Sequence, residues 1–283
     1  MVESTHHMEN ETEHVYEIKC LLKKAAIPRW LHHYGPKRYE LGQHILGLLT
    51  RELFQLSFRR AAQLLRKLGL PVASKSTLHY TAKRIPLCLW QRLLAATLKL
   101  KQVVVAAMDA TGFSRSGASW YYLRRIDGTF SRKYVKVSVL VETRTKKVLS
   151  ACVRMLPRHD TRDVSSLLKN RAPKILVADK GYDSEKVHEL CSSKGIVSMI
   201  PLRARARKGF YRKKMHKRFR LRTYHRRSMV ESVFASLKKR FGSSVRCCKA
   251  RTVRAQIFCR LILHNMICYL VGLRTLQSEA KSI

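Results

Sequence analysis

The sequence predicts an α/β fold, a mixed sheet flanked by helices, preceded by a small all-helical domain. From Tyr39 to Leu68, apolar residues recur at spacings of three and four, as on one face of a helix. After Lys101 the pattern changes to apolar runs and alternation, which are typical of strands. Strands and helices then alternate as far as Pro201. With 46% apolar residues, a chain of 283 residues can form a substantial core.

The first hundred residues divide into a tail and a helical domain. Residues 1–20 are polar and rich in glutamate, so we expect a mobile acidic tail. Residues 21–100 are predicted to be helical. The second helix of this domain should begin after Ser57, a suitable N-cap, and end before Gly69, which suits the C′ position.

A third helix from Thr77 to Arg84, capped by Ser74 or Ser76, follows after a short turn, and a fourth spans Leu87 to Leu98. This order resembles a helix-turn-helix, although any small helical bundle has such turns. The side chains that would then be available for DNA are Lys75, Ser76, Thr77, His79, Tyr80 and Lys83.

The next segment predicts strands. An unbroken apolar run, Val103 to Met108, predicts a buried strand that ends at Asp109. A short strand is expected at Trp120 to Leu123. The alternating stretch Tyr134 to Glu142 and the stretch Val148 to Leu156 predict an antiparallel hairpin.

Helices and strands alternate beyond this hairpin. His159 to Asn170 and Ser184 to Ser193 are predicted helices, and Ile175 to Ala178 and Ile196 to Ile200 are predicted short strands. The first of these strands ends at Asp179. The sheet therefore has helices between its later strands.

The charge of the chain points to a polyanionic partner. Lys and Arg number 58 against 18 Asp and Glu, which gives a net charge of +40. Nucleic acid is favoured over a membrane, because the basic residues are spread along the chain. The apolar run from Ile257 to Leu273 contains Arg260, so we expect a buried helix there and no membrane span.

The eight cysteines form no CxxC pair, and we interpret them as reduced thiols. The glutamate-rich N-terminus has the pattern of neither a signal peptide nor a transit peptide. We therefore expect a cytoplasmic, nucleoid-associated protein.

The stretch from Tyr224 to Lys238 is predicted to be one helix with a functional stripe. At about 100° per residue, Tyr224, Arg227, Glu231 and Lys238 lie within about 60° of one another, beside an apolar arc. Glu231 is the only acid between Glu189 and Glu279. It is either the partner of Arg227 in an ordinary intrahelical ion pair or a metal ligand.

Two further carboxylates, Asp109 and Asp179, follow buried strands, where α/β sheets build their sites. Each could simply be a turn residue. Together with Glu231 they offer the hard oxygen ligands that Mg2+ prefers, with Mn2+ as a substitute. Asp183 is expected to be the N-cap of the next helix, and Asp160 is a reserve ligand that, like Asp163, fits a first helical turn.

The segment from Arg203 to Arg227 contains thirteen Lys and Arg with aromatic residues between them. This composition suits phosphate contacts and base stacking, although a solvated basic loop is the alternative. Arg203, Arg205 and Lys213 are the candidate DNA contacts that we select from it.

The sequences AAMDATGF and ILVADKGYDS and the spacing Y-x2-R-x3-E-x6-K resemble the DDE transposases of insertion sequences, in the subgroup with a YREK signature. The resemblance covers roughly residues 101–273, leaving 274–283 as a tail, and Asn265 also resembles the C-terminal helix of the family. It implies a ribonuclease H-like fold. Many relatives have a sizeable insertion between the second Asp and the Glu, where this chain has only the residues 180–230.

The resemblance also implies roles. Asp109, Asp179 and Glu231 would be catalytic and would bind two Mg2+ ions, whereas Tyr224, Arg227 and Lys238 would hold DNA at the transposon end. Metal-activated water would free a 3′-OH, which would then attack target DNA. The implied partners are double-stranded DNA, as terminal inverted repeats and target, and a second copy of the chain. A nuclease without strand transfer and a non-catalytic DNA-binding protein remain alternatives.

Overall fold

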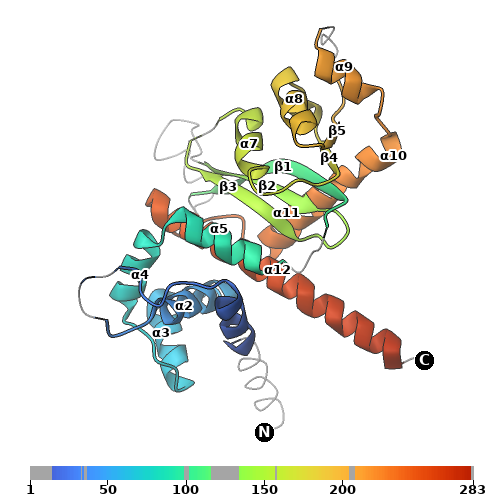
Figure 1. Cartoon of the computed structure of the whole chain (residues 1–283). Coiled ribbons are helices and arrows are strands. Elements are labelled where there is room, and N and C mark those ends of the chain that lie inside the picture. Colours follow the sequence, from blue (N-terminus) through green and yellow to red (C-terminus); the bar gives the residue numbers. More distant parts are fainter. Residues whose placement is uncertain are drawn as a thin grey trace, which may run out of the picture. The chain divides into compact units, whose positions relative to one another are not determined.

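The computed structural model describes residues 15–32, 34, 37–98, 102–115, 134–156, 158–203 and 208–281, with side chains described as far as residue 268 (Figure 1). The predicted strand Trp120 to Leu123 and the candidate Arg205 lie outside these residues. Contacts divide the chain into two units. The N-terminal unit comprises Met1–Thr97 and Cys247–Leu263, and the sheet unit comprises Leu98–Arg246 and His264–Ile283.

The N-terminal unit is helical, as predicted. Its elements are a helix over residues 15–24, α2 (Leu41–Leu53), α3 (Phe58–Lys67), α4 (Lys75–Arg84), α5 (Leu87–Ala96) and the first turns of α12 (Ala250–Lys281). The helix over 15–24 begins inside the segment expected to be a mobile tail, because Val15, Ile18 and Leu22 form an apolar stripe that is buried.

The helix caps of this unit follow the sequence. Ser57 accepts a hydrogen bond from the N–H of Arg60 at 3.2 Å, and Ser74 accepts one from Thr77 at 3.3 Å. Gly69 has φ +67°, the left-handed conformation expected after a helix end. The predictions for Ser57 and Gly69 are confirmed, and Ser74 is the cap of α4.

A buried charge cluster joins α2 to α12 within the N-terminal unit. The carboxylate of Glu52 accepts hydrogen bonds from Arg51 at 3.1 Å, Gln256 at 2.7 Å and Arg260 at 3.4 Å. These partners satisfy a carboxylate that would otherwise be costly to bury. Contacts therefore place residues 247–263 with the N-terminal helices, although the sequence pattern groups them with 101–273.

The sheet unit is built on five strands in the order β3-β2-β1-β4-β5. The strands are β1 (Val105–Ser114), β2 (Tyr134–Glu142), β3 (Val148–Arg154), β4 (Ile175–Ala178) and β5 (Val197–Met199). β2 is antiparallel to β1 and β3, and β1, β4 and β5 are parallel. The mixed sheet and the hairpin are as predicted.

β1 is longer than the sequence indicates. The strand was expected to end at Asp109, but its antiparallel pairing with β2 continues to Ser114 opposite Tyr134. Its parallel pairing with β4 ends at Met108 opposite Ala178. Asp109 therefore lies within β1, at the point where β4 stops.

One face of the sheet packs against short helical segments (Figure 1). These are η1 (Asp160–Asp163), α7 (Val164–Leu167), η2 (Lys180–Tyr182) and α8 (Glu185–Ser193). The predicted helix His159 to Asn170 is thus a 3-10 turn followed by a single α-helical turn. Met108 and Ala178 belong to the core that these segments cover.

The basic segment is divided into α9 (Phe210–His216), α10 (Leu221–Tyr224) and η3 (His225–Arg227), and α11 (Ser228–Phe241) follows. The prediction of one continuous helix from Tyr224 to Lys238 is therefore wrong. η3 contacts both β1 and β4, and this packing accounts for the tighter turn. α11 contacts β1 and covers the other face of the sheet (Figure 1).

The side chain of Asn265, on α12, stabilises β3 within the sheet unit. It is fully buried, accepts a hydrogen bond from the N–H of Val148 and donates one to the carbonyl of Val148, each at 2.8 Å. An apolar side chain in its place would leave two buried backbone groups without these partners.

We predict that Asn265→Leu lowers the free energy of unfolding by about 3 kcal/mol, measured by urea denaturation. The control is Asn170→Leu, at an exposed asparagine of the same unit, which should change stability by less than about 0.5 kcal/mol. Equal stability of the two variants would contradict this role for Asn265.

Candidate active site

Asp109 and Asp179 lie side by side on one face of the sheet. Met108 and Ala178 are the last paired residues of β1 and β4, so the two aspartates are the next residues of adjacent parallel strands. Asp179 keeps an extended backbone, with φ −68° and ψ 159°. Side chains alternate along a strand, so both aspartates point to the face opposite Met108, which is the face that α11 covers.

Arg227 connects Asp109 to Glu231. Its NH2 lies 2.7 Å from Oε1 of Glu231, and its NH1 lies 3.4 Å from Oδ2 of Asp109. The intrahelical ion pair considered for Glu231 is present, and the same guanidinium also reaches the strand. The structure thus places two of the three predicted acids around one arginine and the third on the neighbouring strand end.

Asp109 is the most buried of the three acids. Its side chain is 23% exposed, whereas that of Glu231 is 56% exposed. Burial raises the pKa of Asp109, and the charges of Asp179 and Asp160 raise it further, whereas a hydrogen bond from the N–H of Ala110 and the charge of Arg227 oppose the rise. The net result is a pKa above the ordinary value.

The charge on Arg227 is stabilised in turn. Burial alone would lower its pKa, but the nearby Glu231, Tyr224, Asp109 and Asp179 raise the pKa of the guanidinium above its usual value. Arg227 is therefore a permanent cation that partly neutralises the acidic site.

The donor chemistry of the three acids fits a hard divalent cation, because carboxylate oxygens are the ligands that Mg2+ takes. Among the described residues, however, no group of three or more His, Cys, Asp and Glu side chains is close enough to hold a metal ion. Arg227 occupies oxygens of two of the carboxylates. A shared ion would therefore require Arg227 to release them.

The remaining residues of the predicted stripe lie near this site. The ammonium of Lys238 lies 5.8 Å from the ring centre of Phe113 on β1. Tyr224 ends α10, and its ring packs against Phe219 with the centres 5.6 Å apart. Both side chains are half-buried. The four residues of the predicted stripe therefore lie near one another, although the 3-10 turn η3 separates Tyr224 from the helix that carries Glu231 and Lys238.

The two acids of η1 differ in environment. Asp160 forms an ion pair with Lys136 and remains partly exposed. Asp163 is fully buried and accepts hydrogen bonds from Ser138 and Arg154. Asp160 is close enough to raise the pKa of Asp109, so it stays a reserve ligand. Asp163 is held by its partners in the core.

Sequence analysis missed Tyr182, which follows Asp179 in η2. It is 1% exposed, and its hydroxyl has no hydrogen-bond partner among the residues that the structure describes. Burial raises the pKa of this hydroxyl, and the charges of Asp160, Asp109 and two further aspartates raise it more. The side chain is therefore a neutral phenol beneath the acidic site.

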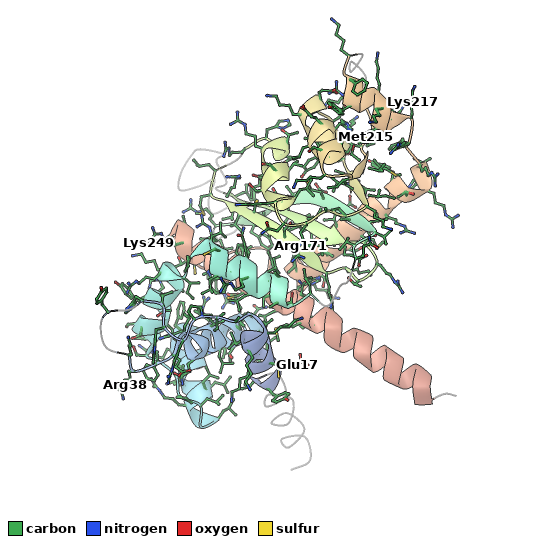
Figure 2. All side chains as sticks on the ribbon, viewed as in Figure 1. Glu17, Arg38, Arg171, Met215, Lys217 and Lys249 are labelled. Atoms are coloured by element: carbon green, nitrogen blue, oxygen red, sulfur yellow. The ribbon has the colours of Figure 1, made fainter. Side chains whose placement is uncertain are left out.

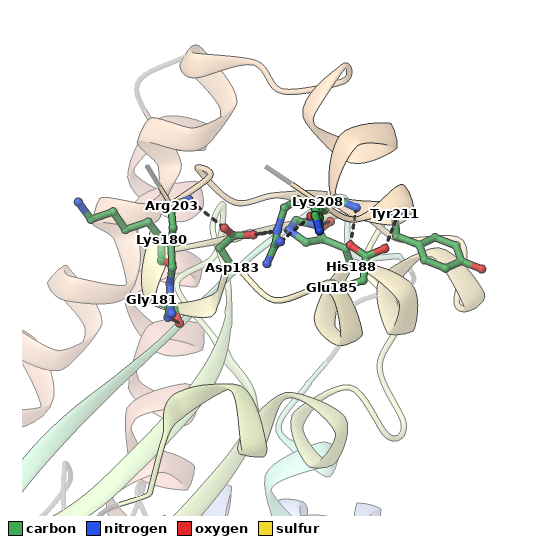
Figure 3. A network of polar contacts seen from close by, with 10 residues as sticks. Lys180, Gly181, Asp183, Glu185, His188, Arg203, Lys208 and Tyr211 are labelled. Atoms are coloured by element: carbon green, nitrogen blue, oxygen red, sulfur yellow. Dashed lines mark hydrogen bonds and ion pairs between the residues drawn. The ribbon is translucent and has the colours of Figure 1, made fainter. Parts of the chain in front are cut away.

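Asp183 is not the N-cap of α8, and that prediction is wrong. The cap position belongs to Ser184. Asp183 instead points into a buried polar network, where it accepts hydrogen bonds from the N–H of Arg203 at 2.8 Å, from Arg212 at 2.7 Å and from His188 at 3.2 Å (Figure 3). One arginine side chain and one backbone N–H that are distant in sequence therefore bind the carboxylate.

The protonation of this network follows from its partners. Burial alone would raise the pKa of Asp183, but its hydrogen bonds and the charge of Arg212 hold it below the usual value. Burial lowers the pKa of His188, so the ring is neutral. Since its Nε2 donates to Asp183, its Nδ1 accepts from Ser198 at 2.7 Å.

The same network fixes the beginning of the basic segment. Glu185 accepts the N–H groups of Tyr211 and Arg212, at 2.8 and 3.1 Å, at the start of α9. The guanidinium of Arg203 donates to the carbonyls of Lys180 and Gly181 (Figure 3). The segment that carries the candidate DNA contacts is thus bound to the loop that follows Asp179.

The other candidate DNA contacts are spread over both units. Lys213 is exposed on α9, and Arg203 already uses its guanidinium in the loop described above. Lys75 is exposed and Lys83 half-buried on α4 of the N-terminal unit. Basic side chains such as Arg38 and Lys217 project from each unit (Figure 2).

The sheet order, with one carboxylate within β1, one after the end of β4 and one on the helix against β1, is that of a ribonuclease H-like fold. A family model described as the transposase DDE domain matches residues 102–266, more than half of the chain. The chain therefore belongs to the transposase DDE domain family, whose members are enzymes that cut DNA and transfer its strands.

Among solved structures, the piggyBac transposase in its synaptic complex with hairpin DNA has a similar fold. The TM-score is 0.50 at 10% identity, over 93% of this chain and 72% of that chain. The catalytic core domain of BIV integrase aligns with a TM-score of only 0.29, at 16% identity, over 56% of this chain and 82% of that one. No curated protein matches the chain.

None of the described helices is long and apolar enough to cross a membrane.

We predict that the pKa of Asp109 responds in opposite directions to its two neighbours. Arg227→Gln should raise it further, because a stabilising positive charge is lost, and Asp179→Asn should lower it, because a repelling charge is lost. The measurement is a pH titration of 13C-labelled aspartate by NMR. Arg226→Gln, at an exposed neighbour, is the matched control and should leave the value unchanged.

We also predict that Asp183→Ala lowers the free energy of unfolding by ~3 kcal/mol at pH 7, because it leaves the Arg212 guanidinium, the Arg203 N–H and the His188 ring without their buried acceptor. The pKa of Asp183 is lower in the folded than in the unfolded state, so its contribution is present above about pH 4 and is lost as the pH falls through the folded-state pKa. Urea unfolding at several pH values measures this. Glu189→Ala, at an exposed acid of α8, should have little effect.

Proposed function

We propose that this chain is the DNA transposase of an insertion sequence, which cleaves phosphodiester bonds at the element ends and joins the freed 3′-OH to target DNA. The observation that carries the proposal is the placement of Asp109 beside Asp179 at the end of the β1–β4 ladder, with Glu231 tied to Asp109 through Arg227. The membership in the transposase DDE domain family supports the same reaction class.

Asp109, Asp179 and Glu231 would hold the divalent cations, Mg2+ or Mn2+, that such a reaction uses. When bound, two such ions supply an activated water and stabilise the leaving 3′ oxygen. Arg227 balances the acidic site in their absence, and its release frees oxygens of Asp109 and Glu231. A nearby cation would favour the charged form of Asp109, which burial disfavours.

The DNA would lie along the basic segment. Tyr224, Arg227 and Lys238 adjoin the acids, and Lys213 and its neighbours on α9 supply phosphate contacts. The assignment of Tyr224, Arg227 and Lys238 to a YREK signature rests on their spacing and on their position beside the acids. Terminal inverted repeats and target DNA would be the substrates, and a homodimer would bring two element ends together. The net charge of +40 would keep the protein on nucleoid DNA.

The test combines cleavage and joining with one set of variants. Purified protein with Mg2+ and the terminal repeats of its element should nick at the ends and join them to a target duplex. Asp109→Ala, Asp179→Ala and Glu231→Ala should each abolish cleavage, a loss of at least about 10³-fold, while DNA binding persists. Glu189→Ala, an exposed carboxylate in the same unit, should retain activity.

Two results would oppose the proposal. Cleavage without joining would identify a nuclease of the same fold. Binding of the repeats with no metal-dependent cleavage at all would identify a DNA-binding protein without catalysis. Chelation by EDTA should stop cleavage and leave binding intact, and a reaction that continues in EDTA would exclude the assigned role of the acids.

A further inference from the structure

The N-terminal unit contains an open pocket of about 850 Å3 that the proposed reaction does not use. Residues 30–32 and 37–39 and the helices α2, α3 and α4 line it. A volume of this size is within the range of sites that enclose a small molecule. It is larger than a single phosphate requires.

The pocket is positively charged. Lys37, Arg38, Arg66 and Arg84 line it, and no Asp or Glu is among the described residues that line it. None of these four cations has a carboxylate partner within the part of the chain that the structure describes. Four uncompensated cations around one hollow favour an anionic ligand. Figure 2 shows Arg38 extending from this unit.

Aromatic rings accompany the cations. Trp30, Tyr39 and Tyr80 line the pocket. The guanidinium of Arg84 lies 5.3 Å from the ring centre of Tyr80, and that of Arg38 lies 5.5 Å from the ring centre of Tyr39. Tyr80 is 56% exposed, so its ring is open to a ligand. Cations placed over aromatic rings are suited to a planar group that bears a phosphate.

The wall also presents a buried group without a partner. His44 is 9% exposed and lines the pocket, and its Nδ1 has no hydrogen-bond partner within the described ranges. Burial lowers the pKa of His44, although a backbone hydrogen bond to Tyr39 opposes the shift, so the ring is neutral near pH 7. Because the other ring nitrogen donates to the backbone of Tyr39, Nδ1 of the neutral imidazole is an acceptor, which suits an amino group on the edge of a nucleobase. The hydroxyls of Thr77 and Thr81 add to this capacity.

We propose that this pocket binds an unpaired nucleotide of DNA, with its phosphate on the cations and its base against the aromatic rings. The proposal rests on the proposed function only in taking DNA as the partner. A base inside a duplex is stacked on both faces and paired along its edge, so it cannot enter the pocket. The ligand must therefore come from a single-stranded extension or a locally opened end.

Simpler ligands explain less of the site. Inorganic phosphate or an acidic peptide would satisfy the cations but would not use the exposed ring of Tyr80 or Nδ1 of His44. Duplex phosphates would need a basic surface and no hollow. Only a nucleotide accounts for the charge, the rings and the volume together.

The test compares duplexes that differ only at one end. Fluorescence anisotropy measures the affinity of the full chain, in EDTA to prevent cleavage, for a blunt duplex and for the same duplex with a four-nucleotide single-stranded extension. The extension should improve the affinity 10- to 100-fold, and an abasic extension with the same phosphates should recover only a small part of this gain, because it lacks the base that stacks on the rings.

Variants assign the effect to the pocket. Arg66→Gln and Trp30→Ala should each reduce the preference for the extension at least fivefold while binding of the blunt duplex changes little. Arg59→Gln is the matched control, since Arg59 is exposed on the same helix and outside the pocket. Arg66 is exposed, so its replacement tests the site even if the half-buried Trp30 is needed for folding.

Several outcomes would overturn the inference. These are equal affinity for blunt and extended duplexes, a preference unchanged in Arg66→Gln, equal binding of abasic and natural extensions, or competition by a tetra-aspartate peptide as effective as that by a tetranucleotide. The Asp109→Ala variant should keep the preference. The experiments therefore test the pocket proposal and the proposed cleavage reaction independently.

Discussion

The parallel pairing of β1 with β4 is the constraint on which the site depends. It ends at Met108 opposite Ala178, and this register makes Asp109 and Asp179 neighbours although 69 residues lie between them. A slip of one residue would turn one aspartate into the core covered by α7 and α8. The apolar strands therefore determine which two carboxylates meet.

Bringing carboxylates together at a half-buried strand end creates repulsion that a cation must relieve. The raised pKa of Asp109 shows this repulsion added to burial, and Arg227 is the cation that opposes it. Because Arg227 also binds Glu231, the helix that carries Glu231 is tied to the strand. An arginine in this position stabilises the acids without a metal and competes with one.

Much of this arrangement is readable from the sequence, and the exceptions have physical causes. The short apolar run that ends at Asp179 indicates β4. A strand that is buried on both faces is recognisable from its own sequence, whichever strand it pairs with. The extra length of β1 depends on pairing with β2, and the break at η3 depends on its contacts with β1 and β4. The role of Asp183 depends on Arg212, which is 29 residues away. Tertiary contacts override local pattern in each case.

The Asp183 network holds the start of the basic segment in place. Arg203 donates to the carbonyls of Lys180 and Gly181, and Glu185 accepts an N–H of the first turn of α9. The basic segment is therefore anchored at Arg203 and at α9 to the residues that join β4 to α8. That connection begins at a catalytic candidate. A loop held by buried, charged hydrogen bonds yields less than one held by exposed contacts. The buried carboxylate of Asp183 thus ties the start of the basic segment to the loop that follows Asp179.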